Sequence, residues 1–305
     1  MANLKNTVIN DTGFLEIPSG TTSQRPSSPA TGMFRFNTDL EYAEVYDGTE
    51  WLPVRPPPLG SELNPAPSAQ VIKAAGDDDG DGVYFIDLPT VGSTPVYCIM
   101  DEAYDGGGWM MALKATRGTT FDYDSSYWTN NNTLNTNSLD QSDTDAKFEV
   151  FNHYQASDLL ARFPDIGNGG SLSVGNWTWL ENNFPQYINE STSTLLNLFN
   201  TANRTFIGDA KQFSGYGSAW SSQTDVRFYG FNYVDRANNS FQRWGFGWNE
   251  NGGGLFPNGN EQSADVAGGI GFEFRGLRYS AGDRIECCQD SSGINRSARV
   301  EIYTR

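Results

Sequence analysis

A short acidic run near residue 80 has the residue types and the spacing of a calcium-binding loop. Residues 77–82 read DDDGDG, which places carboxylates at alternate positions before a glycine, as in the first half of an EF-hand loop. Position 12 of such a loop should be a bidentate glutamate and is Leu88, and the flanking sequence does not predict helices. Asp77, Asp79 and Asp81 are therefore candidate calcium ligands. A solvated acidic turn that leads into a strand is the alternative interpretation.

Few other side chains can do nucleophilic or metal chemistry. The 305 residues include one histidine, His153, and three cysteines, Cys98, Cys287 and Cys288. A Ser–His–Asp or Cys–His arrangement would have to use His153, and no G-x-S-x-G motif accompanies it. A zinc site of the Cys/His kind lacks ligands at usable spacing. We therefore expect a protein that is not an enzyme. A glycosidase, which needs only two carboxylates, stays open as the less favoured alternative.

Charge and composition narrow the class of function. The chain has 20 Lys and Arg against 37 Asp and Glu, and this net charge of −17 disfavours binding to nucleic acid or to an anionic membrane surface. Aromatic residues make up 13% of the chain, which is enough to bury a large core. No apolar run approaches the ~18 residues of a membrane span, and the first residues lack the apolar segment of a secretory signal. We expect a protein that is made in the cytosol and does not insert into membranes.

The elements that must position these residues fall into three parts. Residues 1–54 contain β-prone segments at 33–36 and 43–46, separated by turn signals, which predict a small β-meander of about three strands. So small a unit is marginally stable alone, and we expect it to oligomerise. A stretch with six prolines in fifteen residues follows and predicts a polyproline-like linker over 55–68. Residues 69–305 form the main domain.

The main domain alternates β-prone runs with loops rich in Gly and Asn. Two stretches, 156–163 and 191–201, have helical character, the first because apolar residues follow an acidic first turn at Asp158. These features predict an α+β fold with a mixed or antiparallel sheet, few helices and long Gly/Asn-rich loops. The predicted strands are 83–87, 95–100, 109–116, 226–234, 241–248 and 299–304.

Motifs at both ends of the main domain resemble a known family. The sequences GDGVYFI (80–86), PVYCIMD (95–101) and GGGW (106–109) resemble the opening of fibrinogen C-terminal-like domains. The stretch 252–274 is similar to the calcium- and glycan-binding region of intelectins, which are lectins built on that fold. The resemblance covers about 230 residues and implies a fibrinogen-like fold. The cysteine that the family pairs with Cys98 is missing here, so we expect Cys98 to be a buried free thiol.

The resemblance to intelectins also implies candidate ligands. An acidic middle loop and residues around the Gly-rich loop would hold a structural Ca²⁺ ion, and aromatic rings beside them would contact a glycan. Asn258 stands where the family has glutamate. The calcium candidates from this resemblance are Asp143, Asp145, Asp265, Asn249 and Asn251, and the glycan candidates are Trp248, Asn258, Phe274 and Tyr279.

The first unit resembles a different group of proteins. Its sequence, IPSGTT followed by QRP, GMFRFNTD and EVYDGTEW, is similar to a short module of phage tail-fibre and other virion proteins. This resemblance implies a virion location, with assembly in the host cytoplasm and release without a signal peptide. The implied partners are other virion proteins, bound through residues 1–54, and further copies of the chain, with a trimer as the expected state.

Together the two resemblances imply a structural protein of a phage particle. As a fibre, spike or capsid decoration, it would display the main domain for adhesion to a host-surface glycan. A purely architectural collar, nozzle or cement component is the first alternative, because a fold does not fix a function. A glycan-degrading enzyme is the second alternative and would need a cleft with two facing carboxylates.

Overall fold

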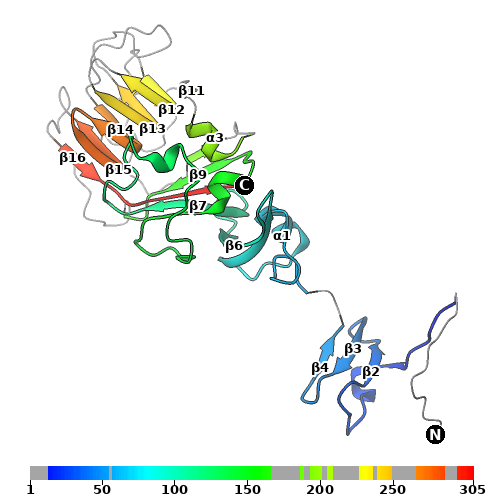
Figure 1. The fold of residues 1–305 in the computed structure, drawn as a ribbon. Helices are drawn as coiled ribbons and strands as arrows, with labels where there is room; N and C mark the ends of the chain where they lie inside the picture. Colours follow the sequence, from blue (N-terminus) through cyan, green and yellow to red (C-terminus); the bar gives the residue numbers. More distant parts are fainter. Residues whose placement is uncertain are drawn as a thin grey trace. The chain divides into compact units, whose positions relative to one another are not determined.

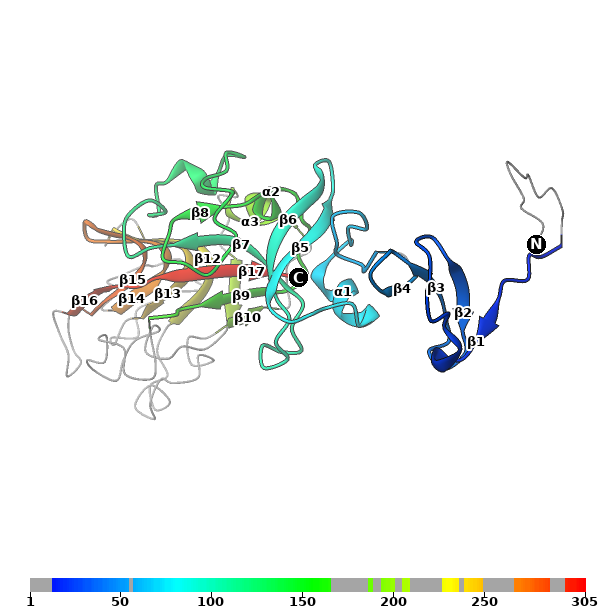
Figure 2. The same cartoon turned by 90° about the horizontal axis from the view of Figure 1, so that it is seen from below.

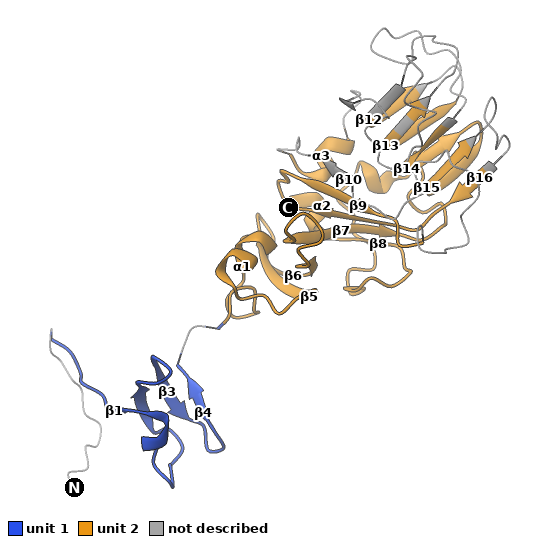
Figure 3. Ribbon diagram, turned by 180° about the vertical axis from the view of Figure 1, so that it is seen from behind, with its two compact units in different colours: residues 1–57 blue, residues 58–305 orange. Residues whose placement is uncertain are grey.

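The chain forms two compact units, Met1–Pro57 and Pro58–Arg305 (Figure 3). The boundary lies within the proline-rich stretch that the sequence predicts to be a linker. The computed structural model describes residues 13–54, 57–165, 186–188, 193–200, 205–208, 227–235, 239–248, 266–285 and 294–305.

The first unit is a four-stranded sheet with the strand order β1-β2-β3-β4. The predicted meander is present as β2 (Phe34–Asn37), β3 (Tyr42–Tyr46) and β4 (Trp51–Pro53), which pair antiparallel. A fourth strand, β1 (Ser19–Gly20), pairs parallel with β2, and the 3-10 turn η1 (Thr22–Gln24) follows it. The segment that contains β1 and η1 therefore lies beside β2, and Thr21 and Thr22 of this segment contact Arg35 and Asn37 of β2.

The second unit contains two antiparallel sheets (Figure 1). The first sheet consists, in pairing order, of β10 (Gln186–Ile188), β9 (Leu159–Arg162), β17 (Val300–Thr304), β7 (Trp109–Ala115), β6 (Gly92–Ile99) and β5 (Gly82–Leu88), with β8 (Ala146–Lys147) also paired to β7. The second sheet consists of β11 (Thr205–Gly208), β12 (Arg227–Asp235), β13 (Ser240–Trp248), β14 (Val266–Phe274), β15 (Leu277–Ile285) and β16 (Ile294–Ser297).

Within the described residues, three short α-helices and the 3-10 turn η2 (Ser126–Trp128) accompany these sheets. The helices are α1 (Ala69–Ala75), α2 (Glu149–His153) and α3 (Leu195–Phe199). The β-rich fold with few helices confirms the coarse α+β prediction. In the part of the chain that the structure describes, none of the helices has the length and apolar character to span a bilayer.

All six strands predicted for the main domain are present, as β5, β6, β7, β12, β13 and β17. The helix predicted over 191–201 is also present, as α3. The helix predicted over 156–163 is wrong, because this stretch forms β9, which pairs with both β10 and β17. Leu160 packs into one apolar cluster, and Leu159 and Ala161 pack into the other. A strand covered on both faces has no polar alternation, so the pattern does not distinguish it from a helix.

The largest core cluster contains side chains from both sheets of the second unit. Phe231 and Trp244 of the second sheet lie 5.6 Å apart by ring centroids, and Trp128 meets Phe199 at 5.0 Å. Near the end of the chain, β17 lies between β7 and β9, and all five of its residues are buried (Figure 2). The last strand therefore closes the centre of the first sheet.

The second half of the predicted linker packs on the second unit. The backbone N–H of Leu59 donates to Asp77 Oδ2 at 2.8 Å. Ala66 is fully buried and forms a parallel bridge with Ile86 of β5. Residues 58–68 therefore lie along the edge of the first sheet, and the main unit begins at Pro58 where the sequence predicts residue 69.

A close approach of two strands in the second sheet gives a testable prediction. Gly245 of β13 pairs with Gly269 of β14, and a Cβ atom at Gly245 would meet the carbonyl oxygen of Gly268 and come 2.8 Å from the Cα of Gly269. We expect Gly245→Ala to destabilise the second unit by ~1–3 kcal/mol in chemical denaturation, because rigid backbone must move. Gly82→Ala is the control, since nothing lies within 4 Å of that Cβ position. Equal losses in both variants would contradict the close-approach argument.

Candidate functional site

The acidic run at 77–82 forms part of a turn whose carboxylates bind backbone amides. Asp77 accepts the N–H of Leu59, and Asp81 Oδ1 accepts the N–H groups of Met100 and Asp101 at 2.7 and 3.0 Å. The backbone N–H of Asp79 donates to the Tyr84 hydroxyl at 2.9 Å. These contacts connect the start of β5 to the end of β6 and to residues before α1, so each of Asp77 and Asp81 has a structural role here.

The predicted acidic middle loop lies beside β7, and its carboxylates already have partners. Asp145 accepts from the backbone N–H of Thr116 at 2.7 Å and from the Thr120 hydroxyl at 2.6 Å. Asp143 forms an ion pair with Arg117 at 2.6 Å, and this hydrogen bond raises the pKa of the Arg117 guanidinium. Arg117 also pairs with Asp165, which follows β9, at 2.5 Å, so a protein cation connects the loop's Asp143 to a carboxylate from another part of the chain.

Sequence reasoning missed a buried lysine that organises the same loop. Lys114 of β7 is 1% exposed, and its Nζ donates to the side chain and the carbonyl of Asp140 and to the hydroxyls of Ser138 and Ser142. The ammonium group holds the pKa of Asp140 well below its usual range. The signal was a single lysine inside the apolar run WMMALKA. Lys114 and Arg117 therefore supply positive charge to this acidic loop.

Two of the predicted glycan-contacting aromatics, Phe274 and Tyr279, lie on the β14–β15 hairpin, and Trp248 ends β13. Phe274 is fully buried with Ala267 and Phe272, so its ring is not at the surface. Tyr279 is half-buried and stacks on Phe272 with ring centroids 6.2 Å apart. The remaining predicted positions, Asp265, Asn249, Asn251 and Asn258, lie outside the described residues, as does the side chain of Trp248.

The structure does not bring the described calcium candidates into one cluster. Among the residues that it describes, no three His, Cys, Asp or Glu side chains meet as a metal-binding group.

His153 lies 2.9 Å by Nδ1 from the Thr90 hydroxyl and 3.3 Å by Nε2 from Glu149. Cys98 is a fully buried free thiol, as predicted, and burial raises its pKa. His153 and Cys98 therefore do not form a Cys–His catalytic pair.

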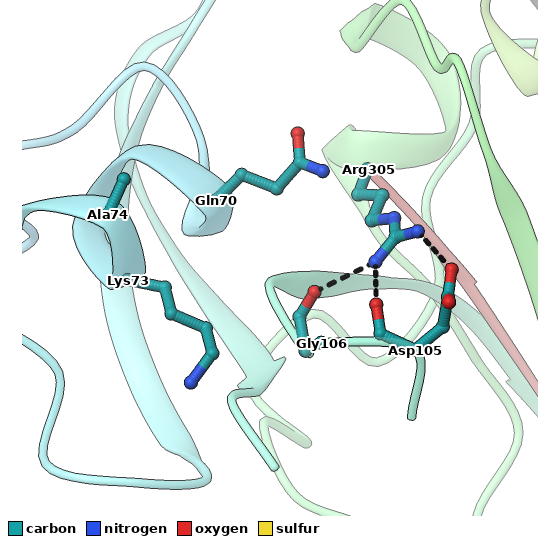
Figure 4. Close-up of a pocket in the computed structure, with 7 residues that line it drawn as sticks. Gln70, Lys73, Ala74, Asp105, Gly106 and Arg305 are labelled. Atoms are coloured by element: carbon teal, nitrogen blue, oxygen red, sulfur yellow. Dashed lines mark hydrogen bonds and ion pairs between the residues drawn. The ribbon is translucent and has the colours of Figure 1, made fainter. Parts of the chain in front are cut away.

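A pocket of about 360 Å³ lies between α1 and the loop that precedes β7 (Figure 4). Arg305 points into it but is already bound: its guanidinium contacts Asp105, Asp158 and the carbonyl of Gly107, and lies 4.1 Å from the ring of Trp109. The pocket has no aromatic lining residue and is near the small end of ligand sites. Its lining residues are Gln70, Lys73, Ala74, Asp105, Gly106, Gly107 and Arg305.

The outer face of the first unit's sheet is the more unusual surface. Its side chains form two rows across the strands: Phe34 pairs with Val45 and Val45 with Leu52, while Phe36 pairs with Ala43, whose carbonyl accepts the N–H of Val54. Phe34, Phe36, Leu52 and Val54 are 36–49% exposed. We call this surface the apolar face; it consists of Phe34, Phe36, Ala43, Val45, Leu52 and Val54.

The opposite face of the same sheet buries charge. Glu44 of β3 is completely buried and accepts from Arg25 Nε at 3.1 Å, from Arg25 NH2 at 2.5 Å and from Asn37 Nδ2 at 3.2 Å. Arg35 of β2 lies 3.7 Å from Glu44 and donates to the carbonyl of Thr21. The hydrogen bond from Arg25 lowers the pKa of Glu44. The segment that contains β1 and η1 covers this polar side.

This arrangement reverses the usual pattern of a one-sided sheet, which packs apolar residues inside and exposes polar ones. Burial of apolar surface is the dominant favourable term in folding and association. In the first unit alone, the side chains of the apolar face are not fully buried. The apolar face gains that free energy only when another surface covers it. The apolar face is therefore the candidate functional site of the first unit.

Comparison with known proteins assigns no family to the chain. No protein-family model matches the sequence, and no curated protein matches it closely enough to count as a relative. The two resemblances drawn from sequence motifs therefore stay predictions.

Proposed function

We propose that the chain is a structural protein of a phage particle, in which the first unit joins the assembly and the second unit is displayed for adhesion to a host-surface glycan. One observation supports this proposal most directly: the first unit has an exposed apolar face and a buried Arg–Glu network. An exposed apolar patch is typical of an interaction site, such as the contact surface of a subunit in a larger assembly. The motif GMFRFNTD, which resembles virion modules, supplies β2 of the same sheet.

The proposal includes binding of a host-surface glycan and of a structural Ca²⁺ ion by the second unit. They rest on the resemblance of the second unit to intelectins, and on the undescribed residues Asn249, Asn251, Asn258 and Asp265 above all. Adhesion through many copies on one particle would let weak single contacts add up by avidity.

A purely architectural role is the second candidate. It is favoured by the ion pairs that occupy the acidic loop, where Lys114 binds Asp140 and Arg117 binds Asp143. Carboxylates that are neutralised within the chain need no metal ion to be stable. A collar, nozzle or cement protein would use the second unit for packing only.

The test is to locate the protein on purified particles. We expect mass spectrometry to find it in mature particles at a fixed copy number, and cryo-EM to show the second unit projecting from the surface. Absence from mature particles would overturn the proposal. A second unit packed flush between neighbouring subunits would favour the architectural role. If the unit projects, glycan arrays with and without Ca²⁺ then test the ligand.

A further inference from the structure

Among the described residues of the first unit, none covers the apolar face. The two phenylalanines of β2 are exposed at 43% and 36%, and Leu52 and Val54 at 39% and 49%. Six apolar side chains in two adjacent rows form one continuous patch, larger than the single exposed apolar residues of an ordinary surface. The patch therefore marks a contact with another protein surface.

The edges of this sheet favour face packing over the addition of a strand. The outer strand β4 has three residues and ends at Pro53, which has no N–H to donate to a further strand. The other edge, β1, has two residues. Short edges with a proline are poor templates for pairing, whereas two sheets stack face to face at ~10 Å with interlocking side chains. The partner is therefore a surface laid over the apolar face.

Charge favours a second copy of the chain as that partner. Two-fold symmetry between identical subunits brings the same surface patch of each subunit together, so a charge within such a patch lies near a charge of the same sign. With a net charge of −17, the chain avoids this repulsion only where its surface is uncharged. The six residues of the apolar face carry no charge, because Arg35 and Glu44 point to the opposite side and pair there.

The same unit offers a second apolar element. Phe14 and Leu15 precede β1 and are 90% and 67% exposed. Because every copy brings both this element and the apolar face, contact between copies can bury more apolar surface than contact with an unrelated polar protein. We infer that the apolar face binds the apolar face of a second copy, and that the two sheets stacked in this way complete the core that the unit lacks alone. This inference rests on the proposed assembly role of the first unit.

The experiment measures self-association of the full chain by sedimentation velocity over a range of concentrations. We expect the wild type to form a dimer at micromolar concentration, because the face of one copy is filled by the same face of a second copy. Phe34→Ser/Phe36→Ser should weaken the association at least ~100-fold, since two large side chains lose their buried contacts. Val91→Ser is the matched control: this valine is 43% exposed on the second unit and should leave the association unchanged. Circular dichroism verifies that each variant is folded.

The outcomes separate this inference from the proposed function. A wild-type chain that stays monomeric at ~100 µM would overturn self-association without any variant, even if the chain is found on particles. If the wild type associates and Phe34→Ser/Phe36→Ser associates equally well, the apolar face is not the contact. If the chain oligomerises through this face but is absent from mature particles, the inference stands and the proposed function fails.

Discussion

Glu301→Ala is expected to destabilise the second unit by ~3–5 kcal/mol, the loss typical of a buried ion pair broken by removal of one partner. Glu301 of β17 is 1% exposed and pairs with Arg299 at 2.7 Å and with Arg162 at 3.4 Å. The Tyr303 hydroxyl also donates to it at 2.8 Å. Without the carboxylate, two guanidinium groups that are each 15% exposed lose their shared anion. The midpoint of thermal unfolding should fall by about 10 °C.

Two further variants separate the buried network from ordinary loss of a surface charge. Glu102→Ala removes a glutamate that is 84% exposed and pairs with Lys73 at 3.5 Å, and it should cost less than ~0.5 kcal/mol. Glu301→Gln keeps a hydrogen-bond acceptor for Tyr303 and should fall between the two. If Glu301→Ala and Glu102→Ala unfold at the same temperature, the network does not stabilise the unit.

The sequence predicted the strands of the main domain best where apolar and β-branched residues were dense. It missed β14, which reads VAGGIGFEF, because its three glycines have low strand propensity. This strand is held by its pairing with β13, including the close Gly245–Gly269 approach. Such pairing joins residues distant in the chain, and no local pattern reports it.

The candidate functional site was only half predictable. The alternation in the β2 sequence FRFN correctly indicated a strand, yet alternation does not say which side becomes covered. The usual expectation is that the phenylalanines face the core. Arg35 and Asn37 are buried instead, because η1 and Arg25 supply partners for them and for Glu44 on that side. Only the three-dimensional path of residues 18–25 decides this outcome.

In the acidic loop beside β7, carboxylates pair with basic side chains of the same chain. The resemblance to intelectins predicts Ca²⁺ at Asp143 and Asp145, but the cation that pairs with Asp143 is Arg117, and the neighbouring Asp140 pairs with Lys114. The sequence identifies this loop as acidic. It did not reveal that the balancing charge comes from β7 and the residues that follow it, 26 residues earlier in the chain.

Glu44→Ala is expected to unfold the first unit and leave the second unit unchanged. At ~0.05–0.15 kcal/mol per residue, a unit of 57 residues has about 3–9 kcal/mol of stability. Removing Glu44 leaves Arg25 and Arg35 without their shared anion, at a cost of ~3–5 kcal/mol. Trypsin should then cleave rapidly after Arg35, whose side chain is 7% exposed in the folded sheet. Glu50→Ala, at an exposed glutamate of the same unit, should stay resistant; rapid cleavage of both variants would contradict this role.

Acid should open the first unit through the same carboxylate. Arg25 lowers the pKa of Glu44 below its ordinary value of 4.5, so the stabilisation is complete above that value and is lost as the pH falls toward the lowered pKa of the folded state. We expect hydrogen-exchange protection of residues 33–46, corrected for intrinsic rates, to decrease between about pH 5 and pH 3. Glu44→Gln removes this titration, and the pH dependence that remains would come from groups such as Asp47, whose pKa is lowered by the backbone N–H groups of Glu50 and Thr49. Identical pH profiles for the wild type and Glu44→Gln would assign the acid response to those other carboxylates and would show that the buried pair does not control the opening of the sheet.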